Sequence, residues 1–217
     1  MTLALFDLDN TLIGGDSDYL WGEFVVSKSL VDVEEYQRLN QEFYLDYVNG
    51  SLDVAAYLRF SMAPLAKIEP ELLAELHAEF MRERIDPIWL SQAESLIKQH
   101  RDFGRQVAVI TATNRFIVEP IVQRFGVENL ICSEPEILNG RYTGNFVGEP
   151  CFGEGKVIKI EEWLAANSLD LNSSWFYSDS HNDLPLLRKV TRPIAVDPDE
   201  KLKIAAQENG WQIISLR

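Results

Sequence analysis

The chain has 217 residues, of which 46% are hydrophobic and 25% are charged. This composition is typical of a globular protein and excludes a disordered or collagen-like chain. With 34 acidic and 20 basic residues the net charge is −14, so the surface offers no positive field for a nucleic-acid backbone or an anionic membrane. We therefore expect neither nucleic acid nor a membrane among the partners.

The two cysteines are too few for a disulfide framework, and they do not form the closely spaced pair that would indicate zinc. The first ten residues, MTLALFDLDN, lack a basic segment, and their apolar run ends at Asp7, unlike a signal peptide. No stretch approaches the ~20 apolar residues of a membrane span. These features favour a cytoplasmic protein, and a monomer and a homodimer both remain open.

Six short apolar runs, several of them rich in β-branched or aromatic residues, predict buried strands. They are Leu3–Leu8, Gln106–Thr111, Leu130–Ser133, Ser174–Ser178, Pro193–Val196 and Trp211–Ile214. Helical patterns lie between many of them, including apolar stripes from Ile117 to Phe125 and from Val157 to Leu164. Strands that alternate with helices predict an α/β fold with a mostly parallel sheet.

The stretch from Gly14 to Leu90 differs, because it has few strand signals and a dense helical periodicity. It contains 15 acidic and 6 basic residues. We expect residues 14–90 to form an α-helical insertion, and residues 1–13 and 91–217 to form the α/β core. Within that core, Asn139-Gly140 between apolar flanks predicts a small β-hairpin.

The first predicted strand ends in the sequence DLDNT, which begins at Asp7 and contains two carboxylates. Ligands of open parallel sheets bind at the carboxyl ends of the strands. At such a place Asp7 and Asp9 can act as metal ligands, as a nucleophile or as a general acid. The alternative is that they merely terminate the strand.

A second acidic cluster, with Asp179 and Asp183, follows the strand predicted at Ser174–Ser178. Four carboxylates near one place repel one another. A hard dication such as Mg²⁺ relieves that repulsion, because it takes oxygen ligands. The alternative is a polar turn in which Asp183 belongs to the first turn of the next helix.

Two more groups fit the same site. Thr111-Ala112-Thr113 closes the strand that begins at Gln106, and it offers hydroxyl and backbone N–H donors. Lys156 follows Gly155 at the start of a helical pattern and offers a cation. The alternatives are a helix cap for Thr111 and an ordinary solvated lysine for Lys156.

Taken in order, these motifs resemble the haloacid dehalogenase-like phosphatase superfamily. The region Val109–Leu184 is similar to its phosphoserine-phosphatase branch, including the stretch NGRYTG from Asn139 and the pair Gly155-Lys156. The stretch Gly14–Phe24 resembles a bacterial subgroup that contains histidinol-phosphate phosphatases. The resemblance covers nearly the whole chain. It implies a Rossmann-like sheet with helices on both faces and an α-helical cap inserted after the first strand.

The resemblance also implies the residues of the chemistry. Asp7 would be the nucleophile and Asp9 the general acid and base. Asp7, Asp179 and the backbone carbonyl of Asp9 would hold Mg²⁺. Asp183 would lie outside these ligands and help to hold the site in place.

Phosphate and substrate recognition follow from the same resemblance. The phosphate would be bound by four residues, Thr111, Ala112, Lys156 and Asn182. Asp16, and with it Asp18, would pair with a cationic group of the substrate, and Arg59 is placed near the position of a carboxylate-binding arginine. His181 either contacts the leaving group or packs against its own loop.

We therefore expect a Mg²⁺-dependent phosphomonoesterase that hydrolyses a small phosphorylated metabolite through an aspartyl-phosphate intermediate. Histidinol phosphate ranks first and phosphoserine second. A dication fits this chemistry, because a carboxylate that attacks a dianionic phosphate monoester meets like-charge repulsion. The alternatives are a phosphomutase or phosphotransferase on the same scaffold and a non-catalytic binding protein.

Overall fold

The computed structural model describes residues 2–217, and over these residues seven strands form one sheet. The strands are β1 (Leu3–Phe6), β2 (Gln106–Asn114), β3 (Asn129–Leu138), β4 (Arg141–Val147), β5 (Trp175–Ser178), β6 (Arg192–Val196) and β7 (Gln212–Ile214). Their order across the sheet is β4-β3-β2-β1-β5-β6-β7. Neighbouring strands run parallel, except that β3 and β4 are antiparallel. The predicted α/β fold with a mostly parallel sheet is confirmed.

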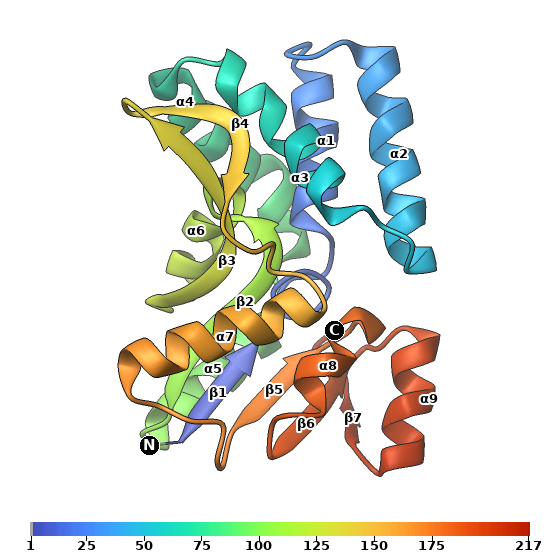
Figure 1. The fold of residues 1–217 in the computed structure, drawn as a ribbon, viewed down its shortest axis with the longest axis vertical. Helices are drawn as coiled ribbons and strands as arrows, with labels where there is room; N and C mark the ends of the chain where they lie inside the picture. Colours follow the sequence, from blue (N-terminus) through green and yellow to red (C-terminus); the bar gives the residue numbers. More distant parts are fainter. Residues whose placement is uncertain (1) are drawn as a thin grey trace.

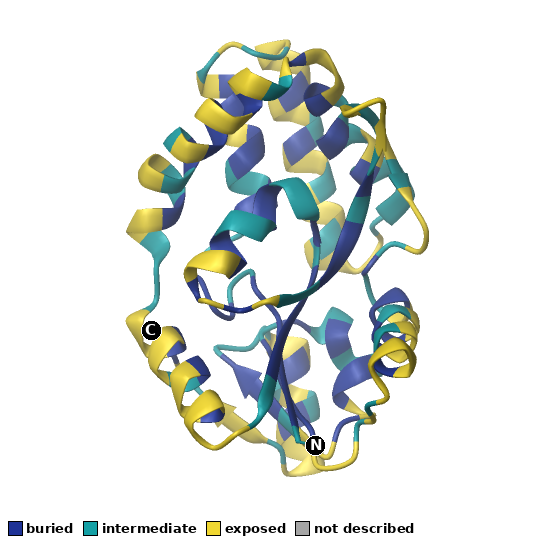
Figure 2. Cartoon of the chain, turned by 90° about the vertical axis from the view of Figure 1, so that its left-hand side faces the viewer, coloured by how far each residue is buried: buried dark blue, intermediate teal, exposed yellow. Residues whose placement is uncertain are grey.

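Strand β1 lies in the middle of the sheet, and all four of its residues are buried. Its side chains alternate between two apolar layers: Ala4 and Phe6 belong to one layer, and Leu3 and Leu5 to the other. A strand that is covered on both faces reads as a continuous apolar run, which is why the sequence revealed it. Figure 2 shows these buried strands running through the molecule between helices with exposed outer sides.

Helices cover both faces of the sheet (Figure 1). They are α5 (Ser91–Asp102), α6 (Arg115–Arg124), α7 (Glu154–Asn167), α8 (Leu184–Leu187) and α9 (Glu200–Asn209). Ile97 of α5 and Ile117 of α6 pack in the layer of Phe6, whereas α7, α8 and α9 pack in the layer of Leu5. The carboxyl edge of the sheet therefore lies between two helical layers that hold it rigidly.

A helical insertion connects β1 to β2. Its elements are α1 (Ser17–Ser27), α2 (Val33–Asn49), α3 (Val54–Met62), the 3₁₀ segment η1 (Ala63–Lys67), α4 (Pro70–Phe80), a π-helical turn (Met81–Ile85) and a short 3₁₀ turn (Asp86–Ile88). The first three helices begin at Asp16, Asp32 and Asp53, whose carboxylates each accept the backbone N–H three residues further on. Aspartates in this stretch therefore define helix starts, besides giving it negative charge.

The insertion leaves and rejoins the rest of the chain through two paired segments. The backbone N–H of Gly14 donates to the carbonyl of Ile88 at 2.8 Å, and Ile13 forms an antiparallel bridge with Trp89. The base of the insertion is also packed into the apolar layer of Phe6, through aromatic residues such as Trp21. We propose that these paired segments are the boundary between a core (1–13 and 91–217) and a helical cap (14–90).

The predicted hairpin at Asn139-Gly140 is confirmed. Both turn residues have positive φ angles, of 50° and 77°, and β3 and β4 pair on either side of them. Strand β4 packs against α3 and η1 of the insertion: the Cα of Ala63 lies only 3.4 Å from where a side chain on Gly144 would begin. Arg141 beside the turn forms an ion pair with Glu69. The hairpin therefore braces one end of the insertion.

Among the helices of residues 2–217, none is at once long and apolar enough for a transmembrane segment.

Candidate active site

The carboxyl ends of β2, β1 and β5 meet at the centre of the sheet. The backbone N–H of Asp7, just after β1, donates to the carbonyl of Tyr177 in β5 at 2.9 Å. Thr111 lies in β2, where the pairing with β3 becomes irregular, and Asp179 follows β5 directly. Adjacent parallel strands thus place the predicted residues at one edge of the sheet, as their positions in the sequence implied.

Lys156 is the buried cation of the site. Its Nζ lies 2.7 Å from Oδ1 of Asp7 and 2.8 Å from Oδ2 of Asp183, which also accepts a 2.7 Å hydrogen bond from Ser178. Burial opposes the charge of Lys156, but Asp183 and Asp7 outweigh it and raise the pKa of the ammonium group. For Asp7 the effect of burial is the opposite: it raises the pKa of the carboxyl group to about 7, although Lys156 lowers it.

The loop before α7 places this lysine. The first turn of α7 lies so close to the preceding loop that a Cβ on Gly155 would lie 2.0 Å from the carbonyl oxygen of Pro150. Real Cβ contacts never come so close, so this position requires glycine. The glycine that precedes the lysine in the sequence therefore has a structural reason, since it lets Lys156 approach the strand ends.

Asp9 faces the insertion. Its Oδ1 accepts the backbone N–H of Ser17 at 2.7 Å, and its Oδ2 accepts the Thr113 hydroxyl at 2.8 Å and the Thr111 hydroxyl at 3.5 Å. Burial, followed by repulsion from Asp16, raises the pKa of Asp9 to about 6, while the hydrogen bonds from Ser17 and Thr113 lower it. A carboxyl group with such a pKa can give up and take back a proton near neutral pH.

Asp179 is held by Thr11. The Thr11 hydroxyl lies 3.1 Å from Oδ1 of Asp179, and the backbone N–H of Asp179 donates to the same hydroxyl at 3.0 Å. Burial, and then repulsion from Asp7 and Asp183, raises the pKa of Asp179 well above its usual value. Among the residues that the structure describes, the one ammonium group at this edge pairs with Asp7 and Asp183, and Asp179 has no cationic partner, so carboxylates outnumber cations here.

This donor set suits a hard dication, because such ions take carboxylate and carbonyl oxygens and relieve the repulsion between carboxylates. Within residues 2–217 there is no group of three or more His, Cys, Asp or Glu side chains placed to hold an ion. The ligand set expected from the sequence is compatible with that result, because Asp9 is expected to contribute its backbone carbonyl and only Asp7 and Asp179 their side chains.

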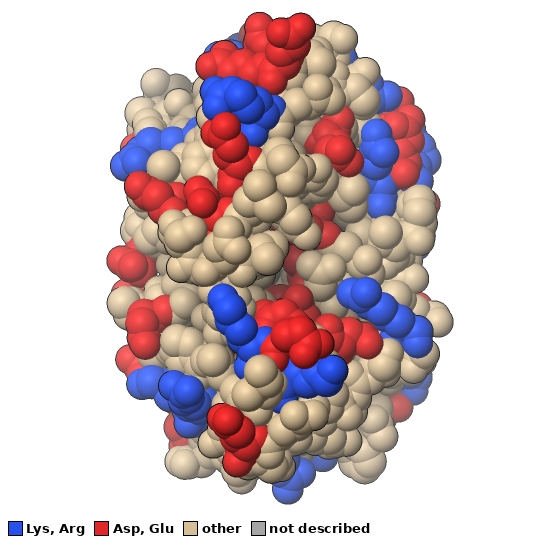
Figure 3. Space-filling view, turned by 90° about the vertical axis from the view of Figure 1, so that its right-hand side faces the viewer, with Lys and Arg blue, Asp and Glu red and all other residues tan. Residues whose placement is uncertain are grey.

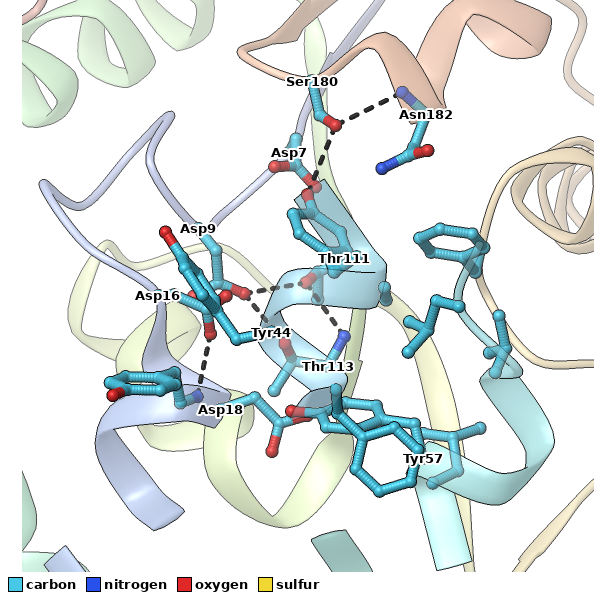
Figure 4. Close-up of a pocket in the computed structure, with 18 of the residues that line it drawn as sticks. Asp7, Asp9, Asp16, Asp18, Tyr44, Tyr57, Thr111, Thr113, Ser180 and Asn182 are labelled. Atoms are coloured by element: carbon cyan, nitrogen blue, oxygen red, sulfur yellow. Dashed lines mark hydrogen bonds between the residues drawn. The ribbon is translucent and has the colours of Figure 1, made fainter. Parts of the chain in front are cut away.

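A pocket opens from these groups toward the insertion (Figure 4). Thr111, Ala112 and Asn182, for which the sequence resemblance implies phosphate binding, line it beside Asp7 and Lys156. The Nδ2 group of Asn182 is buried and has no hydrogen-bond partner among the described residues. An unused donor at this place is available to a bound anion.

The insertion supplies the other end of the pocket. Asp16 and Asp18 line it together with a set of aromatic residues, Tyr19, Phe43, Tyr44, Tyr47 and Tyr57, and Phe152 is contributed by the loop before α7. Burial raises the pKa of Asp16 to about 6 and that of Asp18 to about 7. Sequence reasoning missed the aromatic lining, because the stripe containing Phe43 and Tyr47 also fits a helix packed in a core.

The prediction for Arg59 is not supported by the structure, which places this side chain outside the pocket. Arg59 is exposed on α3, and its guanidinium group lies 5.6 Å from the ring centre of Phe146 in β4. The preceding residue, Leu58, lines the pocket instead. Successive residues of an α-helix point about 100° apart, so a shift of one position in a loose alignment moves a side chain off the pocket face.

His181 contacts the start of α9, and neither of the two alternatives left open by the sequence, a leaving-group contact or packing against its own loop, describes this position. Its Nδ1 lies 2.7 Å from Oδ2 of Asp199 and its Nε2 lies 3.3 Å from Nζ of Lys201. With Asp179 it lines a neighbouring groove between α2 and the C-terminal part of the chain. On the face turned toward the viewer in Figure 3, acidic side chains gather in a hollow flanked by basic ones.

The chain matches the model of the haloacid dehalogenase-like hydrolase family over residues 4–188. It is 46% identical over 219 residues to a histidinol-phosphatase of Neisseria meningitidis, with 99% of each chain covered. It is 36% identical to a phosphoserine phosphatase of Mycobacterium tuberculosis, over 99% of this chain and 70% of that protein. The chain therefore belongs to the haloacid dehalogenase-like hydrolase family. With named phosphatases among its relatives, the predicted enzyme class, a hydrolase of the phosphatase type, is confirmed.

Solved structures agree on the fold. A protein of unknown function from Bordetella pertussis Tohama I superposes with a TM-score of 0.93 at 44% identity, covering 100% of this chain and 99% of that one. A substrate-bound phosphoserine phosphatase superposes with a TM-score of 0.70 at 21% identity, covering 99% of this chain and 92% of that one. The predicted resemblance to the phosphoserine-phosphatase branch, with its Rossmann-like sheet, is therefore confirmed at the level of the fold.

Proposed function

We propose that the protein is a Mg²⁺-dependent phosphomonoesterase that works through an aspartyl-phosphate on Asp7. The carboxylates of Asp7 and Asp179 and the backbone carbonyl of Asp9 would hold the metal. When bound, Mg²⁺ would offset the repulsion between Asp7 and a dianionic phosphate group. The excess of buried carboxylates over ammonium groups at this edge supports the assignment.

In the first step a carboxylate oxygen of Asp7 attacks phosphorus, and the ester P–O bond breaks. Asp9 gives its proton to the leaving alkoxide, so the dephosphorylated product departs as a neutral alcohol. In the second step Asp9 takes a proton from water, the hydroxide attacks phosphorus, and the bond to Asp7 breaks. Inorganic phosphate leaves and both aspartates return to their first state. The raised pKa of Asp9, about 6, supports this dual role.

The transferred phosphoryl group carries negative charge on its three outer oxygens. Lys156 would neutralise part of that charge, and Thr111, Ala112 and Asn182 would donate hydrogen bonds to it. Asp183 accepts a hydrogen bond from Lys156, so its role would be to hold the ammonium group in line with Asp7. The unused amide donor of Asn182 supports this arrangement.

We infer that the substrate is a small amine-bearing metabolite without a carboxylate, with histidinol phosphate first. The observation that carries this inference is the charge of the lining. Among the described residues that line the pocket, Lys156 is the only Lys or Arg, and Asp7 and Asp183 already engage it. Asp16, Asp18 and the surrounding aromatic rings offer an environment that attracts cations.

Phosphoserine ranks second. The relative that is 36% identical and is named a phosphoserine phosphatase favours it. The substrate carboxylate of phosphoserine would need a cationic partner, and the residue expected to supply one, Arg59, lies over Phe146 instead. The relative that is 46% identical and is named a histidinol-phosphatase supports placing histidinol phosphate ahead of phosphoserine.

The test is a phosphate-release screen over histidinol phosphate, phosphoserine and phosphoethanolamine with Mg²⁺ present. We expect free phosphate, with kcat/KM highest for histidinol phosphate. Preferred hydrolysis of phosphoserine would overturn the substrate order. Transfer of the phosphoryl group to an added alcohol or sugar, without release of free phosphate, would show a phosphotransferase. Failure to turn over any phosphate monoester would overturn the proposed function.

A further inference from the structure

Asp18 presents one satisfied and one unsatisfied oxygen. Its Oδ1 accepts the hydroxyl of Ser61 at 2.8 Å. Its Oδ2 is buried and makes no close hydrogen bond among the described residues, although the Tyr57 hydroxyl lies near enough to the carboxylate to lower its pKa. An unpaired buried carboxylate oxygen costs stability, so it requires an explanation beyond packing.

A chain of buried polar groups fixes the orientation of Asp18. Nδ2 of Asn114 lies 3.3 Å from the Ser61 hydroxyl, which in turn donates to Asp18. Asn114 is itself held in place, because its Oδ1 accepts the backbone N–H of Ile117 at the start of α6. All three polar side chains are buried. The chain therefore runs from the carboxyl end of β2, through α3, to α1, and it turns the free oxygen of Asp18 away from Ser61.

Asp18 lies at the end of the pocket farthest from the phosphate site. In Figure 4, Asp18 and Tyr57 lie at the opposite end of the cavity from Asp7 and Asn182, with Asp9 between them. Asp16 occupies an intermediate position in the same view. A substrate whose phosphate lies at Asp7 therefore meets Asp16 first and Asp18 further on.

Resting on the proposed function, we propose that Oδ2 of Asp18 is a second recognition point, which accepts an N–H from a planar, nitrogen-containing ring of the substrate. Asp16 pairs with the separate aliphatic amine of the same molecule. Ser61 and Asn114 are positioning residues that act through Asp18. The substrate class is then a phosphate monoester that carries both an amine and an N–H heteroaromatic ring.

The aromatic lining supports a ring at this place. Tyr57 lines the pocket beside Asp18, and Phe43 and Tyr44 of α2 also contribute to the pocket lining. Flat aromatic walls pack well against a flat ligand, and their faces attract a ring that carries positive charge. Burial also holds the pKa of Asp18 near 7, and a cationic ring would restore its charged form.

The experiment compares two substrates that share the amine and the phosphate. Histidinol phosphate carries the ring, and phosphoethanolamine lacks it. We expect Asp18→Asn to lower the ratio of kcat/KM between histidinol phosphate and phosphoethanolamine by about tenfold or more, chiefly through KM. Ser61→Ala should change the ratio in the same direction, and Ser61→Thr, which keeps the hydroxyl, should restore it.

The chain offers a matched control pair on the exposed end of α2, where the Ser51 hydroxyl donates to Asp46 at 3.2 Å. Asp46→Asn and Ser51→Ala repeat the same chemical changes away from the pocket, and the ratio should stay at the wild-type value. A ratio for Asp18→Asn within about twofold of wild type would overturn the inference.

A measurement on the unmodified protein covers the case in which Asp18→Asn does not fold. L-histidinol and ethanolamine are compared as competitive inhibitors of p-nitrophenyl phosphate hydrolysis, and L-histidinol should bind about tenfold more tightly or better. Equal inhibition would overturn the inference while phosphatase activity stands. Loss of all phosphatase activity in the unmodified protein would overturn the proposed function and this inference together.

Discussion

The ammonium nitrogen of Lys156 lies 2.7 Å from Oδ1 of Asp7, although the two residues are 149 positions apart in the chain. Neither side chain is more than 9% exposed. Buried charges are costly unless they are paired, so each residue depends on the other for its place in the fold. The stability of the site and its proposed chemistry therefore depend on the same contact.

Replacing Lys156 with methionine should affect both stability and turnover. Asp7 and Asp183 would lose their shared cation, and leaving buried carboxylates unpaired costs about 3–5 kcal/mol. Urea denaturation measures the stability and phosphate release measures the turnover. Lys189→Met removes an exposed ion pair with Glu161 and serves as the control, with little change expected in either quantity. Unchanged turnover in Lys156→Met would contradict its assignment to the phosphate.

Asp7→Asn should abolish turnover, because an amide is a poor nucleophile and cannot form the phosphorylated intermediate. The measurement is phosphate release under saturating substrate, combined with mass spectrometry of acid-quenched protein. The unmodified protein should show a phosphorylated fraction on Asp7, and the variant none. Normal turnover by the variant would remove Asp7 from the mechanism.

Chelation by EDTA should stop turnover, and added Mg²⁺ should restore it. Binding of the ion should also raise the melting temperature, since a ligand at about 100 times its Kd stabilises the folded state by about 2.7 kcal/mol. Asp179→Asn should weaken this thermal response, because it removes one proposed ligand. Metal-stripped protein that remains fully active would rule out the metal assignment.

Stability should fall as the pH rises toward neutrality in the metal-free protein. Burial raises the pKa values of Asp16 and Asp18 from 3.8 to about 6 and about 7. Between about pH 4 and pH 7 the folded state therefore binds more protons than the unfolded state, and the free energy of unfolding decreases with pH. Urea denaturation at pH 5 and pH 8 checks this. Asp18→Asn should flatten the decline, and a rise across the same window would contradict the argument.

Tyr47→Phe tests the contact between the insertion and the core. The hydroxyl of Tyr47 donates to the Ser180 hydroxyl at 3.3 Å, and both residues line the pocket and the neighbouring groove. Loss of this bond should cost about 1 kcal/mol, which we expect to appear as an increase of a few fold in KM. Ser180→Ala should have a similar effect, and the two changes together should be less than additive. Strict additivity would show that the bond is not formed in solution.

The strands and the site were predictable because they depend on local sequence. A fully buried strand such as β1 is a short apolar run, and its end is marked where Asp7 interrupts that run. The strand stops at Phe6 rather than at the predicted Leu8, because the chain turns out of the sheet there, and the backbone N–H groups of Leu12 and Ile13 bond back to the carbonyl of Leu8. Polar residues at the strand ends then identify the site edge.

The strand order and the lining of the pocket were not predictable in this way. The order of the sheet depends on contacts between residues far apart in the chain, such as the pairing of Leu5 with both Ala108 and Phe176. The aromatic residues of α2 form the same periodic stripe whether they face a core or a cavity. The prediction that Arg59 lies near the substrate is not supported for a related reason. The rotation of the helix decides which of two neighbouring residues faces the pocket, and here that residue is Leu58.

The hairpin of β3 and β4 has a consequence for how a product can depart. Its residues Arg141 and Phe146 contact Glu69 and Arg59, and these contacts hold the part of the insertion that contains α3 and η1. At the far side, α2 meets the core through the hydroxyl contact of Tyr47 with Ser180. If the insertion moves away from the core, the movement should therefore pivot about the hairpin and be widest at the tip of α2. The released alcohol should then leave near the tip of α2, while the pocket stays closed on the hairpin side.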